Sequence, residues 1–238
     1  MIKTRSVSSC LTCPRRSQTD WRDLSDDELK LVDAYKSDRV MQPGEVLYHQ
    51  GDEAEGIYCI KDGLIGERRI DVEGNSMLVR LGHPSTTMGY QELLTRTPYR
   101  NTAEILQPSH VCFLNRNVIR QLLDRNPKLG ERFLRRSMQD FEKLENDYVE
   151  ARTMDVQGRF LHVLMVLYER FGREDPQAGH VVELPINRQD LAALVGTAPE
   201  TISRTIRKLD RNGLVHIKGK RADIPNLAAV FREITLPN

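Results

Sequence analysis

Four polar side chains between Pro199 and Leu209 have the types and the spacing to form hydrogen bonds with base edges from one face of a helix. If this stretch is helical, its apolar residues form one stripe and its polar residues share the opposite face. The stripe is Ile202, Ile206 and Leu209, and the polar face is Glu200, Ser203, Arg204 and Arg207. On such a face an arginine can pair with a guanine edge through two nitrogens, and a glutamate can accept from a cytosine or adenine amino group. A serine can reach a base edge or a thymine methyl group.

The charge around this stretch is locally positive, although the chain as a whole is nearly neutral. The 238 residues include 35 Lys+Arg and 34 Asp+Glu, which gives a formal net charge of +1. Between Arg188 and Arg221, however, eight basic residues stand against three acidic ones. A solvated helix face usually carries both signs interspersed, whereas a local excess of basic residues is typical of a surface that binds phosphates. The segment is therefore predicted to bind nucleic acid.

Capping and turn residues predict that this stretch is the second helix of a helix-turn-helix. Asn187 is a favourable N-cap for a first helix, and Gly196 supplies the left-handed residue that ends it. Pro199 suits the first turn of the second helix, which ends at Asn212-Gly213. The residues that follow, 214–224, are predicted to form a hairpin with a basic tip, which makes the motif a winged helix-turn-helix.

The part of the chain before residue 115 has the pattern of a β domain. Turn residues interrupt it at intervals of about ten, and Asp62-Gly63 is one of these turns. The expected strands cover residues 45–48, 56–60, 64–66, 76–80 and 111–114. Many short strands at regular spacing predict a sandwich or a barrel. A capping box formed by Ser25 and Glu28 predicts that a short helix begins there and continues to about Ala34, ahead of the strands.

A long helix is predicted to follow, because Pro127 opens a stretch with heptad spacing. Residues of one set recur every seven positions: Leu134, Phe141 and Tyr148. Each is followed three positions later by a residue of a second set: Ser137, Leu144 and Ala151. This spacing favours a parallel two-helix dimer seam. Packing of the helix on its own strands is the alternative. The candidate dimer interface consists of Leu134, Phe141, Leu144 and Tyr148.

Along nearly its whole length the chain resembles the CRP/FNR family of bacterial transcription regulators. The run Pro199-Glu200-Thr201-Ile202-Ser203-Arg204 is similar to the FNR-type recognition helix, E-x-x-S-R, rather than the CRP-type pattern R-E-x-x-x-R. The resemblance implies an α+β fold with a β-barrel (jelly roll) of the cyclic-nucleotide-binding type. The implied domains are an N-terminal arm with a CxxC at 1–23, the effector barrel at 24–125, the dimerisation helix at 126–153 and the winged helix-turn-helix at 154–238.

For function, the resemblance implies a homodimer that binds a palindrome with FNR-like half-sites, TTGAT and its complement. By their positions in the motif, Arg188, Thr197 and Thr201 are phosphate-contact candidates. Glu200, Ser203, Arg204 and Arg207 would face the bases, and Lys218 and Lys220 of the wing would contact the backbone. The implied partners are double-stranded DNA, a second copy of the chain and, if the protein activates transcription, RNA polymerase. A signal at the β-barrel would set the activity.

The four cysteines raise the question of whether the signal is sensed by a bound iron–sulfur cluster. FNR holds a [4Fe–4S] cluster on four cysteines, and the resemblance places Cys10, Cys13 and Cys112 on three of those positions. The fourth cysteine is absent: Thr19 stands at its position under one spacing and Trp21 under another. Asp20 lies next to both residues. We expect no bound cofactor, because an oxygen ligand such as Asp20 would hold one iron only weakly. An oxygen- or redox-responsive [4Fe–4S] sensor is the alternative, and Cys59 is expected to be a small core residue.

A cyclic-nucleotide-dependent regulator of the CRP type is a further alternative. Binders in the family carry a Gly-Glu pair for the ribose and an Arg-Ser/Thr-Ala run for the cyclic phosphate. Here Gly89 is followed by Tyr90, and Asn101-Thr102-Ala103 replaces the arginine run, with Arg100 one position early. Gly89, Arg100 and Thr102 are the candidate effector-pocket residues.

Other classes of protein lack support in the sequence. No Ser/His/Asp, HExxH or phosphate-loop pattern occurs, so we expect no enzyme activity. The longest apolar run, Val163 to Tyr168, has six residues, whereas a membrane-spanning helix needs about 20. The N-terminal residues have no apolar core of the kind found in a secretory signal, so we expect a cytoplasmic location with no membrane partner.

Overall fold

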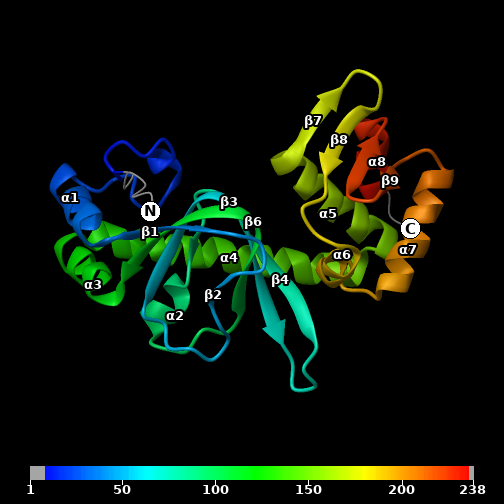
Figure 1. The fold of residues 1–238 in the computed structure, drawn as a ribbon. Helices are drawn as coiled ribbons and strands as arrows, with labels where there is room; N and C mark the ends of the chain where they lie inside the picture. The colour runs from blue at the N-terminus through cyan, green and yellow to red at the C-terminus, as the bar shows by residue number, and fades with distance from the viewer. Residues whose placement is uncertain (1–8, 236–238) are drawn as a thin grey trace, which may run out of the picture. The chain divides into compact units, whose positions relative to one another are not determined.

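The computed structural model describes residues 9–235 of the chain, which form two compact units (Figure 1). The units are Met1–Phe141 and Glu142–Asn238. The division falls inside the longest helix, α4 (Pro127–Thr153), which begins at Pro127 as predicted. Residues 1–8 lie outside the described residues, so the absence of a secretory signal stays a prediction. None of the described helices combines the length and the apolar composition needed to cross a membrane.

The N-terminal unit is built on an antiparallel sheet whose two long strands pair along their whole lengths. These strands are β3 (Gly56–Ile70) and β6 (Thr102–Asn115). The sheet order is β1-β6-β3-β4, with β2 paired to β6 and β5 paired to β3. The shorter strands are β1 (Ser37–Met41), β2 (Val46–Tyr48), β4 (Ser76–Gly82) and β5 (Thr87–Met88). The predicted β domain is confirmed, although β1 and β5 were not among the expected strands.

The Asp62-Gly63 pair is a bulge inside β3, so the prediction of a turn between two strands is wrong. The register of β3 against β6 shifts on both sides of Asp62. Gly63 has a φ of +94°, and a Cβ at this position would lie 2.1 Å from Oγ of Ser109. Glycine is therefore required for both the backbone conformation and the close approach of β6. Bulges and turns use the same residue types, which is why the sequence pattern does not separate them.

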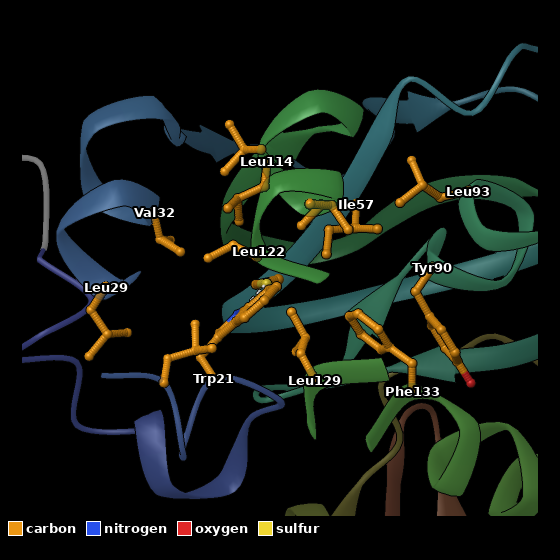
Figure 2. Close-up of a cluster of buried hydrophobic side chains, with 14 residues drawn as sticks. Trp21, Leu29, Val32, Ile57, Tyr90, Leu93, Leu114, Leu122, Leu129 and Phe133 are labelled. Atoms are coloured by element: carbon orange, nitrogen blue, oxygen red, sulfur yellow. Dashed lines mark hydrogen bonds between the residues drawn. The ribbon is translucent and has the colours of Figure 1, made fainter. Parts of the chain in front are cut away.

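Helices cover the core of this unit. The first, α1 (Asp26–Tyr35), begins at the predicted capping box, in which Ser25 accepts from the amide of Glu28 and Glu28 accepts from the amide of Ser25. The others are α2 (Tyr90–Thr95), α3 (Arg116–Arg125) and the beginning of α4. Figure 2 shows the core that they share with the sheet. In it, the ring of Phe133 lies 6.3 Å from that of Trp21 and 5.5 Å from that of Tyr90, measured between centroids.

The N-terminal arm is more ordered than its composition suggests. Its described residues include one short 3-10 helix, η1 (Arg16–Gln18). Trp21 is 5% exposed and anchors the arm in the core of the sheet domain (Figure 2). Packing of this one side chain therefore holds the arm against the sheet domain.

Most of α4 does not pack on the sheet. Its buried residues, Leu129, Arg132 and Phe133, all lie in its first two turns. The four candidate seam residues, Leu134, Phe141, Leu144 and Tyr148, are 62%, 56%, 63% and 61% exposed. The alternative in which this stripe packs on the chain's own strands therefore does not hold for these side chains.

The C-terminal unit contains a four-stranded antiparallel sheet, in the order β7-β8-β10-β9, together with the helices that follow α4. The strands are β7 (Gly172–Asp175), β8 (Gly179–Glu183), β9 (His216–Lys218) and β10 (Arg221–Ile224). The helices are α5 (Val156–Phe171), α6 (Arg188–Val195), α7 (Pro199–Arg211) and α8 (Leu227–Thr235). The strands β7 and β8 form a hairpin in front of the helix-turn-helix, and neither this hairpin nor α8 was among the expected elements.

Candidate functional site

The angle between α6 and α7 is fixed by the turn that joins them. The side chain of Asn187 accepts from the amide of Asp190 and caps α6, as predicted. Gly196 lies in the left-handed region, with φ 69° and ψ 49°, and its amide donates to the carbonyl of Ala193. The next amide, that of Thr197, donates to the carbonyl of Ala192. These bonds satisfy the last carbonyls of α6 and direct the chain into α7.

The second helix, α7, buries one face and exposes the other. Ile202 and Leu209 are completely buried, and Ile206 is 6% exposed, which confirms the predicted stripe. On the opposite face Glu200, Arg204 and Arg207 are exposed and Ser203 is half-buried. This face therefore presents one carboxylate, one hydroxyl and two guanidinium groups at i, i+3, i+4 and i+7.

The guanidinium groups on this face are held by contacts within the helix. Arg204 donates to Oγ1 of Thr201 at 3.3 Å, and Arg207 donates to the carbonyl of Ser203 at 3.2 Å. In the described part of the chain neither arginine forms an ion pair with a carboxylate. Both cations are therefore available to an external acceptor. Arg204 lies in the first half of α7, which is the part of a recognition helix that contacts bases.

The three phosphate-contact candidates lie at helix N-termini. Arg188 is the first residue of α6, Thr197 lies in the turn before α7, and Thr201 lies in the first turn of α7. All three are half-buried. The first amides of a helix have no partners within the helix, so this is where an anion finds donors.

The wing consists of β9 and β10. Lys218 and Lys220 are exposed on either side of Gly219, whose φ of +61° allows the tight turn. Arg221 instead pairs with Asp223 at 2.7 Å and with Asp175 at 3.7 Å, so its charge is partly neutralised within the unit. The free positive charge of the wing is therefore at the two lysines.

One contact between the wing and α7 was not predicted. Nδ1 of His216 in β9 lies 2.6 Å from Oδ1 of Asp210 at the end of α7. This contact joins the wing to the helix that it accompanies. An acidic residue in the last turn of a helix, followed by a histidine in the next strand, is too common a pattern to reveal the contact from sequence.

The comparisons with known proteins agree with this architecture. Residues 38–126 match the cyclic nucleotide-binding domain, and residues 158–230 match the Crp-like helix-turn-helix domain. The chain belongs to the CRP/FNR family of transcription regulators. It is accordingly a DNA-binding transcription regulator of the CRP/FNR type.

Relatives within the CRP/FNR family differ in the signal that their names indicate. The "Anaerobic regulatory protein" of Bacillus subtilis is 24% identical over 195 residues, which cover 82% of each chain. The "CRP-like cAMP-activated global transcriptional regulator" of Mycobacterium tuberculosis is 23% identical over 177 residues, which cover 74% of this chain and 79% of that one. The structure of FixK2 from Bradyrhizobium japonicum superposes with a TM-score of 0.73 at 16% identity, covering 85% of this chain and 99% of that one.

The candidate effector-pocket residues of this CRP/FNR-type sheet domain are held by other partners. Arg100 donates to Glu92 at 3.1 Å and to Gln91 at 2.7 Å, both of which belong to α2. Thr102 accepts from the amide of Gln50 at 3.0 Å. Gly89 has a φ of +76° and adjoins the ring of Tyr99. The three residues therefore do not form a group directed at one ligand.

The cysteines of this CRP/FNR-type regulator lie close to one another, and Cys59 is the small buried core residue that the sequence predicts. Cys59 in β3 is directly opposite Cys112 in β6 in the antiparallel register. Nε1 of Trp21 donates to Sγ of Cys59 at 3.0 Å, and Sγ of Cys112 donates to Asp38 at 2.9 Å. Desolvation raises the pKa of Cys59 to about 12 and also raises the pKa of Cys112. Both are therefore protonated thiols at neutral pH.

Cys10 approaches the same strands from the arm. Its Sγ accepts from Nζ of Lys36 at 3.4 Å, and desolvation raises its pKa to about 11. Cys10, Cys13, Cys59 and Cys112 line a single hollow. The family resemblance places Cys10, Cys13 and Cys112 in one group. Cys59 was not assigned to this group, because only the pairing of β3 with β6 brings it next to Cys112.

Asp20, the carboxylate considered as a cluster ligand, is fully engaged elsewhere. It is 9% exposed, its Oδ2 accepts from Oγ1 of Thr87 at 2.6 Å, and it forms an ion pair with Arg136 of α4. The ion pair with Arg136 and the hydrogen bond from the buried hydroxyl of Thr87 satisfy the carboxylate, so Asp20 is not free to act as a metal ligand. Asp20 also does not line the hollow that contains the thiols.

Proposed function

We infer that the protein acts as a homodimer and binds a two-fold symmetric DNA site with FNR-like half-sites, TTGAT and its complement. The observation that carries this proposal is the exposed face of α7, where Glu200, Ser203 and Arg204 follow the E-x-x-S-R spacing. Arg204 would pair with the guanine of the half-site, and Glu200 would accept from an amino group of the complementary strand. Arg188, Thr197 and Thr201 would fix the register through the phosphates.

The dimer would form through α4. Leu134, Phe141, Leu144 and Tyr148 are exposed at heptad spacing, which is the arrangement that a second copy of the same helix covers in a parallel coiled coil. A symmetric dimer also presents two copies of α7 to the two half-sites of a palindrome. The proposed dimer and the proposed DNA site therefore have the same two-fold symmetry.

The remaining parts of the proposal concern partners and location. We propose that the protein works in the cytoplasm, as a regulator rather than an enzyme, and that it contacts RNA polymerase if it activates transcription. A titration of the full chain with a TTGAT palindrome and with a scrambled duplex tests the central part. Equal affinity for both duplexes would contradict the proposed sequence preference.

The wing lysines provide a prediction about nonspecific binding. Lys218→Ala or Lys220→Ala should weaken binding to all duplexes alike and reduce the slope of log K against log salt by about one unit, because each removes one phosphate contact. Fluorescence anisotropy at several salt concentrations measures the slope. Lys30→Ala in α1 is the matched control and should leave the slope unchanged. A change in sequence preference without a change in slope would show that the wing does not contact the backbone.

A further inference from the structure

The wing strand β9 has little support from its own sheet. It lies at the edge of the four-stranded sheet, and its partner among the described strands is β10. The pairing runs from His216, which is opposite Asp223, to Lys218, which is opposite Arg221. A short edge strand leaves amides and carbonyls unpaired and opens easily. The position of the exposed Lys218 therefore depends on what else holds β9.

A side-chain contact to α7 gives this strand a second support. Nδ1 of His216 lies 2.6 Å from Oδ1 of Asp210, which is in the last turn of α7. Among the described residues, this is the one side-chain hydrogen bond or ion pair that joins α7 to the wing. Residues two apart in a strand share a face, so the side chain of Lys218 leaves β9 on the same face as that of His216. The contact therefore fixes the orientation of the strand that carries Lys218.

Lys220, the second lysine of the wing, is held in a different way. Its carbonyl accepts from the amide of Leu184 at 2.6 Å. The next residue, Arg221, begins β10, which is an inner strand and pairs with β8 on the side away from β9. Lys220 should therefore keep its position when the contact between α7 and β9 is broken. The two lysines thus provide an internal comparison.

The carboxylate of Asp210 lies where a negative charge is otherwise unfavourable. It is at the carboxyl end of α7, where the helix dipole favours cations. It also belongs to a helix that faces a polyanion in the proposed function. Arg207 precedes it by three residues, yet the side-chain partner of Asp210 among the described residues is His216. The carboxylate therefore serves the wing rather than the arginines of its own helix.

We propose that Asp210 is a positioning residue for DNA binding: through His216 it holds β9 so that Lys218 reaches a phosphate while α7 contacts the bases. This inference rests on the proposed contact of the wing with the DNA backbone. It goes further by making an acidic residue, which phosphates repel, necessary for full affinity. Electrostatics alone predicts the opposite sign, because loss of a carboxylate strengthens the attraction to a polyanion.

The pair also makes the contribution of Lys218 depend on pH. Imidazoles change charge between about pH 5 and about pH 8, and the charged form donates more strongly to a carboxylate. The charged groups around the imidazole are Asp210 from α7, Asp223 opposite it in β10 and Lys218 two residues along β9. Asp223 is engaged by Arg221 at 2.7 Å. Lys218 should therefore contribute more to binding at about pH 6 than at about pH 8.

The test is a double-mutant cycle on the full chain, measured as the slope of log K against log salt for a TTGAT palindrome and a scrambled duplex. Asp210→Asn nearly preserves side-chain volume. It should weaken binding to both duplexes by about fivefold at about 0.15 M salt and lower the slope by about one unit, because one phosphate contact is lost. Adding Lys218→Ala to this variant should cause no further loss. Adding Lys220→Ala should still lower the slope by about one unit.

Further variants separate positioning from a general effect of charge or folding. The exchange variant Asp210→His with His216→Asp restores the contact with its partners reversed and should recover the wild-type slope. Glu169→Gln removes an exposed carboxylate from α5 of the same unit and should leave the slope unchanged. The pH dependence of wild-type binding should be smaller in Asp210→Asn, although that variant keeps the imidazole. His216→Gln serves if Asp210→Asn fails to fold, and circular dichroism with a thermal scan checks folding in each case.

Three results would overturn the proposal. Tighter binding of Asp210→Asn at an unchanged slope would show that the carboxylate is a repulsive charge only. A full further loss on adding Lys218→Ala to Asp210→Asn would show that Lys218 does not depend on the pair. An unchanged slope in Lys218→Ala alone would refute the wing contact and, with it, the role of the pair. Failure of the DNA-site proposal is seen separately, as equal affinity of the wild-type protein for the palindrome and the scrambled duplex.

Discussion

Arg204→Ala should abolish most of the preference for the TTGAT palindrome while leaving weak, salt-sensitive binding to any duplex. A bidentate arginine–guanine pair contributes about 1–3 kcal/mol of discrimination, and a dimer makes two such pairs. The specificity ratio should therefore fall by about fivefold to about 150-fold per half-site. Because Arg204 is exposed and donates only to Thr201 among the described residues, the substitution should leave folding stability within about 0.5 kcal/mol of wild type.

Two matched variants separate loss of charge from loss of base contact. Lys208→Ala removes one positive charge from the second half of the same helix and should weaken all duplexes alike. Arg204→Lys keeps the charge but loses the planar fork, so it should behave like Arg204→Ala in specificity and closer to wild type in nonspecific affinity. Competition binding with palindromic and scrambled duplexes at fixed salt measures both quantities. An unchanged preference in Arg204→Ala would show that α7 does not read the bases as assigned.

Phe141→Asp should convert the protein to a monomer. In the proposed seam this substitution puts two carboxylates against each other, and burying an unpaired carboxylate costs several kcal/mol. Because Phe141 is 56% exposed in the single chain, the monomer itself should fold normally. Sedimentation velocity at micromolar concentration should show a monomer, and affinity for the palindrome should fall by at least about a hundredfold, since both half-sites must be held together.

Asn146→Asp is the matched control for the seam. It adds the same charge to α4, but its heptad position faces away from Leu144 and Tyr148. This variant should remain a dimer with wild-type DNA affinity. A dimeric Phe141→Asp protein would exclude this helix face as the interface, and a monomeric Asn146→Asp protein would show that the effect of charge is not confined to the seam.

The helix-turn-helix was predictable because its signals are local. Asn187, Gly196 and Pro199 each determine a helix end through their own backbone or side-chain chemistry, and the structure confirms all three. The seam of α4 was visible for the same reason, since heptad spacing belongs to one helix. Helix α8 was not predicted, although Asn226 precedes it and accepts from the amide of Ala229, as an N-cap residue does.

The sheet domain was less predictable because strand pairing is non-local. Asp62-Gly63 has turn composition, and only the approach of Ser109 from β6 shows that the pair is a bulge. Cys59 is the buried core residue that the sequence predicts, but its position opposite another cysteine was not predictable, for a related reason. Its register partner, Cys112, is far along the chain, and no spacing rule connects the two. The position of Asp20 also depended on a distant residue, Arg136, which binds its carboxylate.

The most direct test of the central claim is a stoichiometric titration of a fluorescent TTGAT palindrome with the full chain. The account predicts that binding saturates at two chains per duplex, and that changing the guanine in both half-sites weakens it by about 2–6 kcal/mol, or 1–3 for each Arg204 contact. The same guanine change should have no further effect in Arg204→Ala. Saturation at one chain per duplex, or an equal penalty for the guanine change in wild-type and Arg204→Ala proteins, would contradict the account.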